Sequence, residues 1–316
     1  MSNESCKIEN VGGQAVIEGV MMRAGNRIAT SVRRRDGSIE TKLQEKALIS
    51  KKNKLFGLPI IRGALNLIDM LSIGISSLNW SAEIAEADER EAQGKEAKKA
   101  AVWPAMVFGL ALGIGLFVLL PMLISKLFGF EKSAFLFNLI AGTVRVVIFF
   151  GYLIGISFLP DVKRLFQYHG AEHKSIFNFE KGQEVTIENA RQYSTHHPRC
   201  GTSFIIIVAG LSIVFFAIID SIIAAVFNYI PPIFIRFAIH LALWPLLAGV
   251  CYEVLKLSAK LSSRYSWAHF LVWPGLAVQN ITTIEPTDDM LEVAITSLKA
   301  ALGNPDSDGT ETDAAG

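Results

Sequence analysis

The sequence is short of charge and of cysteine. Only 19% of its 316 residues are charged, whereas soluble globular proteins carry about 25%, and the mean hydropathy is +0.38. The 30 lysines and arginines nearly balance 29 aspartates and glutamates, which excludes a strongly basic nucleic-acid-binding protein, so we expect no nucleic-acid partner. The three cysteines, Cys6, Cys200 and Cys251, are too few and too far apart for a disulfide framework and suit a reducing compartment.

Long apolar runs are absent from the first fifty residues, so we expect no signal peptide. Farther along the chain, four apolar stretches approach or exceed the roughly 20 residues that cross a bilayer as a helix. They predict a mainly α fold, a polytopic helical membrane protein with about four transmembrane helices, whose first partner is the lipid bilayer. The four predicted spans are residues 101–125, 133–160, 204–230 and 233–251.

Lysine and arginine residues flank these spans unevenly. They precede the first span, fill the loop 161–203 and follow the fourth span. The loops after the first and third spans carry only Lys126 and Lys132. Because cationic loops are retained in the cytoplasm, we expect both termini and the 161–203 loop to face the cytoplasm.

Residues 55–80 are also apolar, but their polar side chains recur at helical spacing and form one stripe. This pattern favours an interfacial helix that lies against the bundle. A fifth transmembrane helix is the alternative, and it would place the N-terminal region on the other side of the membrane. The polar positions are Arg62, Asn66, Asp69 and Ser76.

The sequence outside the spans divides into small regions. Apolar and polar residues alternate over 14–48, and Asp36-Gly37 is typical of a hairpin turn, so a small β-hairpin or sheet is expected there. Pro286, followed by two aspartates, favours a helix that runs to about Leu302. The predicted regions are 1–50, a cytoplasmic β-rich region; 51–100, the interfacial helix and a charged helical linker; 101–260, the four-span membrane domain; 261–302, a cytoplasmic segment with a helix; and 303–316, a disordered tail.

The loop 161–203 carries four of the six histidines. His169 and His173 are four residues apart on a predicted helix, so both imidazoles project from the same face. With Glu172 they form the H-x-x-E-H pattern of inverted zincins, in which the histidines bind Zn²⁺ and the glutamate acts as the base. The alternative is two histidines packed in a core near the membrane. Gly170 also disfavours the helix by about 1 kcal/mol relative to alanine.

A second cluster, residues 196–201, reads H-H-P-R-C-G and lies just before the third span. If the second and third spans are antiparallel neighbours, the two clusters meet at one membrane surface. A histidine or Cys200 then completes a three-ligand site with an open position, as catalytic zinc requires. We therefore predict a divalent-metal centre, with zinc as the expected ion and Glu172 as the catalytic residue. The predicted ligands are His169, His173, His197 and Cys200.

Other interpretations of these residues stay open. Glu253, at the cytoplasmic end of the fourth span, competes for the third metal position, although it can also pair with Lys256. Arg199 and the nearby histidines could instead lower the pKa of the Cys200 thiol and make it a nucleophile. A third interpretation is purely structural: residues 196–201 form a turn before a helix, and Cys200 is a small buried residue without a chemical role.

Ionisable side chains inside the predicted spans are costly and therefore indicate partners. Counted from the ends of their spans, Arg145 and Asp220 lie at depths that agree within about 3 Å, so we predict that they pair. His240 lies at a comparable level. A salt bridge that holds the helices together is the simpler interpretation, and the ion path of a transporter is the other.

Four motifs resemble the YqhQ-like family of bacterial integral-membrane proteins of unknown function, some of which are labelled predicted metal-dependent enzymes. The resemblance implies a multi-span protein of the bacterial plasma (inner) membrane and favours a metal site, but it implies no substrate. The first motif has no context for nucleotide binding; we expect a sheet edge over the histidines, with Glu18 near them. The motifs are G-G-Q-A-V-I-E-G-V-M-M-R at 12–23, H-G-A-E-H-K at 169–174, H-P-R-C-G-T-S-F at 197–204 and T-T-I-E-P at 282–286.

Two functions of different classes are compatible with these patterns. The first is a membrane protein with a cytoplasm-facing divalent-metal site that acts as a metal-dependent hydrolase. The alternative is a non-enzymatic membrane scaffold or transporter, with a structural histidine or metal cluster and an intramembrane Arg–Asp pair.

Overall fold

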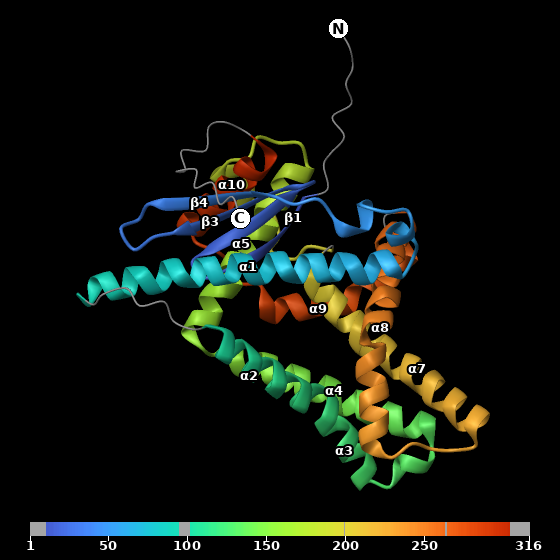
Figure 1. Cartoon of the computed structure of the whole chain (residues 1–316). Coiled ribbons are helices and arrows are strands. Elements are labelled where there is room, and N and C mark those ends of the chain that lie inside the picture. The colour runs from blue at the N-terminus through green and yellow to red at the C-terminus, as the bar shows by residue number, and fades with distance from the viewer. Residues whose placement is uncertain (1–10, 95–101, 199, 263, 304–316) are drawn as a thin grey trace.

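The computed structural model describes residues 11–94, 102–198, 200–262 and 264–303. A small antiparallel sheet and its covering helices form one end of the molecule, and a bundle of long apolar helices forms the other (Figure 1). The predicted mainly helical fold with a small N-terminal sheet is confirmed. The predicted tail after Gly303 lies outside the described residues.

The sheet has the strand order β1-β2-β3-β4, with every neighbouring pair antiparallel. The predicted Asp36-Gly37 turn is confirmed: Gly37 has a φ of 90°, and Asp36 accepts a 2.9 Å hydrogen bond from the backbone N–H of Ser38. The strands are β1 (Val11–Val16), β2 (Gly19–Ala24), β3 (Arg27–Arg33) and β4 (Ile39–Glu45).

Both faces of the sheet are covered, which is why every residue of β2 is buried. Val20, Met22 and Ala29 face a core shared with α5, α6 and α10. Met21 and Ile28 face the opposite way and pack against α1. The covering helices are α1 (Ile61–Ala92), α5 (Pro160–Glu180), α6 (Ile187–Arg191) and α10 (Asp288–Leu302).

The helix predicted after Pro286 is confirmed as α10. It begins after Thr287 and ends at Gly303, which adopts the left-handed conformation (φ 82°) of a helix C-cap. Its Ser297 hydroxyl donates a 2.9 Å hydrogen bond to the carbonyl of Ala29 in β3. The C-terminal helix and the N-terminal sheet therefore belong to one packed unit.

The bundle contains the four predicted spans. α8 continues well beyond the expected end at Cys251, and α9 then returns along it. A π-helical turn, η3, separates α2 from α3. The bundle elements are α2 (Val102–Ile114), η3 (Gly115–Leu119), α3 (Leu120–Leu127), α4 (Ala134–Ser157), α7 (Gly201–Phe227), α8 (Ile233–Ser262) and α9 (His269–Thr282); short 3₁₀ turns are η1 (Ile49–Lys51), η2 (Leu55–Gly57), η4 (Phe130–Lys132) and η5 (Ser266–Ala268).

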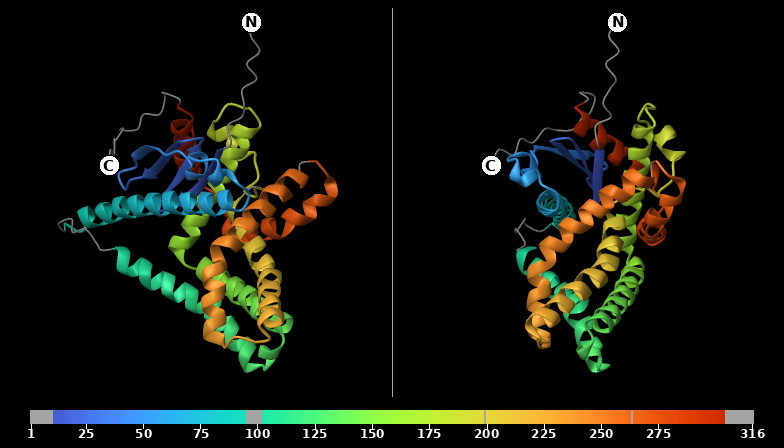
Figure 2. Two further views of the ribbon diagram at one scale, coloured as in Figure 1. Left: turned by 45° about the vertical axis from the view of Figure 1, so that its right-hand side comes forward. Right: turned by 90° about the vertical axis from the view of Figure 1, so that its right-hand side faces the viewer.

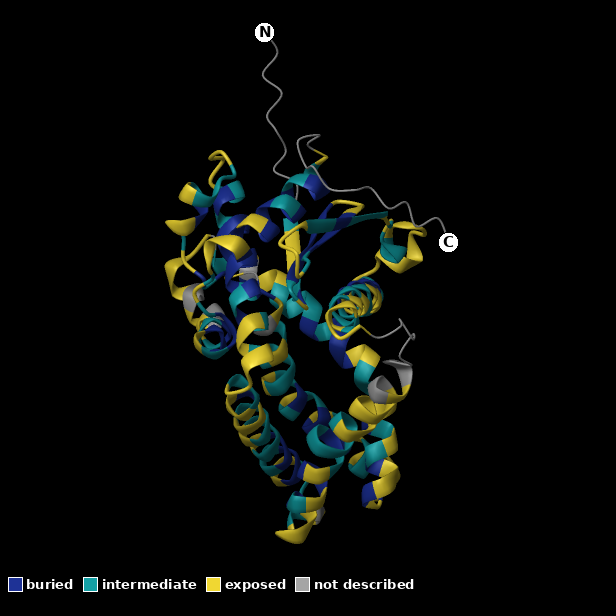
Figure 3. Cartoon of the chain, turned by 90° about the vertical axis from the view of Figure 1, so that its left-hand side faces the viewer, coloured by how far each residue is buried: buried dark blue, intermediate teal, exposed yellow. Residues whose placement is uncertain are grey.

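In the part of the chain that the structure describes, five helical stretches are long and apolar enough to cross a membrane. Four of them form the bundle, and many of its outward-facing residues are exposed (Figure 3). The fifth, α1, runs across the end of the bundle. The right-hand view of Figure 2 shows α1 end-on and the bundle helices lengthwise. Large apolar side chains are exposed on all of these elements, such as Phe108, Val147, Val214 and Phe234. These surfaces suit contact with lipid.

The predicted pair of Arg145 and Asp220 is wrong. Asp220 instead lies 2.5 Å from the Arg236 guanidinium and 3.1 Å from His240 Nε2. It also accepts a 2.7 Å hydrogen bond from the Asn138 amide. All four side chains of this network are buried.

The register of α4 against α7 explains the error. Asn138 of α4 lies level with Asp220 of α7, so Arg145, two turns farther along α4, lies level with Ser212 and bonds to its hydroxyl at 2.9 Å. Arg145 Nε also donates to the carbonyl of Phe117 at 2.7 Å. Phe117 belongs to the π-helical turn η3, where the regular helical hydrogen bonding is interrupted and a carbonyl can accept from a neighbouring helix.

Candidate metal centre

α5 carries the first histidine cluster where the sheet meets the bundle. Pro160 starts the helix, and Gly182 (φ 66°) follows its end, as predicted. Gly170 has a packing reason: a Cβ there would lie 2.2 Å from the carbonyl oxygen of Ile284. Ile284 in turn donates its backbone N–H to the carbonyl of Phe166 at 3.0 Å. The glycine that seemed unfavourable thus allows the 282–286 segment to lie directly on the helix.

Backbone carbonyls fix the orientation of both histidine rings. His169 Nδ1 lies 2.8 Å from the carbonyl oxygen of Thr282, and His173 Nδ1 bonds to the carbonyl oxygen of Thr195. A carbonyl only accepts, so each Nδ1 carries a proton, and in the neutral imidazole the lone pair is on Nε2. The two ring centroids are 4.4 Å apart.

Nothing in the described part of the chain bonds to the buried Nε2 of His173. Such an orphaned nitrogen is costly in a protein interior unless something outside the chain binds it. Burial lowers the pKa of His173 to about 2, which keeps the imidazole neutral. A neutral imidazole whose Nε2 lone pair has no hydrogen-bond partner is the form that binds metal ions.

Cys200 brings the third donor. It immediately precedes α7, is buried, and its Sγ lies 3.2 Å from His169 Nε2. One donor atom from each of His169, His173 and Cys200 lies within 4.8 Å of the other two. The two clusters therefore meet as their positions next to neighbouring spans predicted.

Glu172 completes the surroundings of these donors. Its carboxylate is buried, with Oε2 3.9 Å from His169 Nε2. It also forms a hydrogen bond with the backbone of Gly13 in β1, where a Cβ would lie 2.9 Å from the Glu172 Cγ. Burial raises the pKa of Glu172 to about 7, while His169 acts in the opposite direction. The edge of the sheet thus covers the carboxylate.

His197 lies beside this group but outside it. Its Nε2 is 3.4 Å from a carboxylate oxygen of Glu180, and its ring meets the edge of Phe177 at a centroid distance of 4.5 Å. Its backbone N–H donates to the buried Gln279 side chain at 2.7 Å, and Gln279 donates back to its carbonyl at 2.9 Å. Burial lowers the pKa of His197 to about 4.

Two other acidic residues do not reach the donors. Glu253, the competing third ligand, pairs with Arg62 of α1 at 2.5 Å. Glu18 pairs with Arg164 and lies 3.4 Å from the Tyr168 hydroxyl. The sheet edge contacts Glu172, between the two histidines in the chain, through Gly13, whereas Glu18, expected near the histidines, pairs with Arg164.

The sequence patterns missed the carbonyls of Thr195 and Thr282 and the side chain of Gln279. Residue type does not reveal which backbone carbonyl accepts a hydrogen bond, so the two threonines carried no readable signal. The T-T-I-E-P motif did mark the neighbourhood of Thr282, because it was part of the family resemblance.

Comparison with known proteins agrees with that resemblance. Residues 58–304 match the family model described as "Protein of unknown function (DUF1385)". The chain belongs to this family. It is 33% identical, over 306 residues, to "Uncharacterized protein YqhQ" of Bacillus subtilis (strain 168), with 92% of both chains covered. No solved structure matches it. Membership in the YqhQ-like DUF1385 family is thus confirmed, and neither description names an activity.

Proposed function

We propose that this protein is a metal-dependent hydrolase whose divalent ion, zinc by its donor set, is bound by His169, His173 and Cys200. The observation that carries the proposal is the convergence of three buried or half-buried donors, one of them the orphaned Nε2 of His173. Two imidazoles and one thiolate form a donor set that zinc prefers. Three protein ligands leave a fourth position open, as in catalytic zinc sites.

The groups behind the donors support the same proposal. Metal-binding histidines usually donate their second ring N–H to a carbonyl or carboxylate, which fixes the ring and its tautomer. The Thr282 and Thr195 carbonyls accept from the two histidines in this way. The donors are therefore oriented in advance of binding.

A bound zinc ion would supply Lewis acidity toward a water molecule and toward a substrate carbonyl or phosphoryl oxygen. Glu172 would accept the proton of the attacking water and return it to the leaving group, because its carboxylate lies 3.9 Å from His169 Nε2. The sheet edge at Gly13 limits the access of bulk water to this carboxylate.

We further propose that four helices cross the bacterial inner membrane and that α1 lies in its plane. The sheet precedes α1, yet Gly13 of β1 touches Glu172 of α5, so an even number of crossings must separate them. α2–α3 and α4 supply two crossings, and a third crossing by α1 would make the number odd. The cationic flanks support a cytoplasmic location for this shared side.

The two sides of α1 support this arrangement. The residues that face the sheet recur every four positions and are buried, and Thr30 of β3 bonds to one of them, Ser77, at 3.0 Å. Exposed apolar side chains line the opposite side of the helix, as expected for a helix at a membrane surface. These are Ile61, Ile68, Leu71, Ile75 and Leu78.

The test is metal analysis of the purified protein, followed by hydrolysis assays of the zinc-loaded form on ester, amide and phosphate-ester substrates. We expect bound zinc and hydrolysis that depends on Glu172. Stoichiometric zinc without turnover of any substrate would favour the alternative, a structural centre in a membrane scaffold or transporter. Absence of bound metal would refute the proposal.

A further inference from the structure

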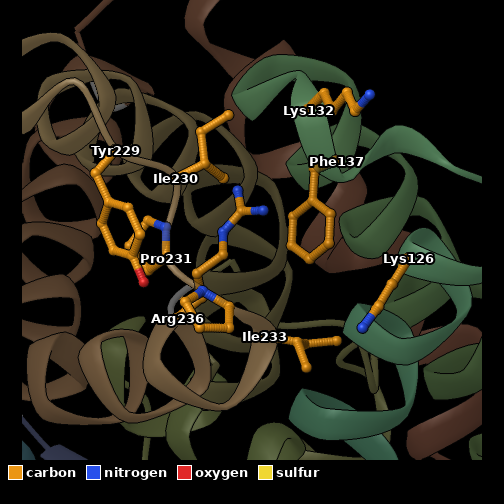
Figure 4. Close-up of a pocket in the computed structure, with 9 residues that line it drawn as sticks. Lys126, Lys132, Phe137, Tyr229, Ile230, Pro231, Ile233 and Arg236 are labelled. Carbon is orange, nitrogen blue, oxygen red and sulfur yellow. The ribbon is translucent and has the colours of Figure 1, made fainter.

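A cavity of about 430 Å³ is lined by the residues drawn in Figure 4. The elements that supply them meet at the end of the bundle that lies away from the sheet (Figure 1). It lies where the end of α3, the turn η4 and the start of α8 meet, and the 229–232 connection closes one side. Its volume falls in the range of about 300–1,000 Å³ typical of ligand sites. Because it lies at the opposite end of the bundle from His169 and His173, the cavity is separate from the proposed metal centre.

Three cationic residues line this cavity: Lys126, Lys132 and Arg236. Arg236 is 2% exposed, and its guanidinium lies 3.8 Å from the centre of the Phe137 ring, beside which it stands in Figure 4. Its charge is balanced by Asp220 at 2.5 Å. Arg236 thus forms a fixed part of the cavity wall, and the net charge of the cavity does not come from it.

The two lysines give the cavity its positive charge. Both are exposed, and within the described residues neither forms an ion pair. Among the described side chains that line the cavity there is no carboxylate. An anion is therefore the ligand that this charge favours.

The surface around the cavity is strongly apolar. In a membrane these side chains would contact acyl chains, and lysines at this level extend to the headgroups. An amphiphile with an anionic head fits this combination better than a free ion, which would leave the apolar surface unused. Exposed residues next to the cavity are Leu127, Phe128, Phe227, Tyr229, Ile230 and Phe234.

We propose that this cavity binds the phosphate group of an anionic phospholipid in the leaflet opposite the metal centre. Lys126 and Lys132 contact the phosphate, and the acyl chains lie along the exposed apolar side chains. The buried Asp220–Arg236 pair holds the wall of the cavity in place and is not broken by binding.

The test uses the purified, delipidated full-length protein in a neutral detergent. Thermal stabilisation and native mass spectrometry measure binding of phosphatidylglycerol, phosphatidylcholine and inorganic phosphate. The variant is Lys126→Gln/Lys132→Gln. The control is Arg35→Gln/Lys181→Gln, which removes two exposed charges far from the cavity, near the sheet and after α5. Because the exchanged side chains are all exposed, both variants should fold, which their elution from a sizing column verifies.

The proposal predicts that phosphatidylglycerol binds the wild type more tightly than phosphatidylcholine does, by about tenfold or more. Both lipids offer a phosphate, but the cationic choline group opposes the two lysines, whereas phosphatidylglycerol keeps a net negative charge. The lysine variant should lose this preference, and the control should keep it. Equal binding of both lipids, or an unchanged preference in the lysine variant, would overturn the proposal. If inorganic phosphate stabilises the protein and phosphatidylglycerol adds no further stabilisation, the bound phosphate is not that of a lipid, and the proposal is overturned.

Discussion

The Nε2 atom of His169 lies 3.2 Å from the Sγ atom of Cys200, although 31 residues separate the two along the chain. One residue lies within α5 and the other directly before α7. The side-by-side packing of α4 with α7 brings these two positions to the same end of the bundle. The proximity of the two donors is therefore a consequence of how the bundle folds.

Replacing Glu172 should separate metal binding from catalysis. Glu172→Gln keeps the size and the packing of the side chain but removes the proposed base. We expect zinc content to be unchanged and hydrolysis to fall by about 10²-fold or more, the usual contribution of a general base. Glu184→Gln, an exposed position in the same loop, is the matched control. Full activity of Glu172→Gln would contradict the assigned role.

Gly13 should be intolerant of any side chain. An added Cβ would lie 2.7 Å from the Met21 carbonyl oxygen and 2.9 Å from the Glu172 Cγ. We therefore expect Gly13→Ala to destabilise the protein by about 1–3 kcal/mol, as overpacking does. Gly12→Ala is the control, because nothing lies within 4 Å of its added Cβ. Thermal unfolding in detergent measures both, and equal stability would contradict the close packing of β1 on α5.

The intramembrane network predicts which pairs of substitutions interact. Asp220→Asn removes the negative charge that lies 2.5 Å from the buried Arg236 guanidinium and should destabilise the protein by about 3–5 kcal/mol. The double variant Asp220→Asn/Arg236→Met should be no worse than either single variant. Combining Asp220→Asn with Arg145→Met should instead be additive within about 0.5 kcal/mol, because within the described residues the two share no hydrogen-bond partner. Coupling between Arg145 and Asp220 would contradict the register of α4 and α7.

The proposed topology predicts where reporters face. Reporters fused after Gly182 and after Leu302 should show cytoplasmic activity, and reporters after Gly129 and after Asn228 should show external activity. A reporter inserted before α1, at Gly37, should show the same cytoplasmic activity as the reporter after Gly182. A Gly37 reporter on the external side would mean that α1 crosses the membrane.

Local patterns predicted much of the fold. The four apolar runs, the Asp36-Gly37 turn and the helix that starts at Asp288 were each indicated by neighbouring residues, because length, turn chemistry and helix capping are local properties. The extension of α8 and the return of α9 were missed. His240, expected at a comparable level, does lie beside Asp220. The partners Arg236 and Asn138 were missed, because depth counted from predicted span ends carries an error of two helical turns.

The candidate site divides in the same way. The spacing of His169 and His173 predicted a shared face, and the position of Cys200 beside a neighbouring span predicted that it would join them. His197 was expected beside them as a ligand, yet its ring turns toward Glu180. A single sequence does not show in which directions the turn before α7 points the side chains of His197 and Cys200. In the structure, the two hydrogen bonds between the Gln279 side chain and the His197 backbone fix this turn.

Zinc content of the purified variants tests the central claim most directly. The wild type should contain about one zinc ion per chain, and His169→Ala, His173→Ala and Cys200→Ser should each lose most of it. His197→Ala and Glu253→Gln should retain the metal. His196→Ala should retain it too, since His196 bonds to Asn280 at 3.0 Å. Full retention of zinc in both His169→Ala and His173→Ala would contradict the metal centre.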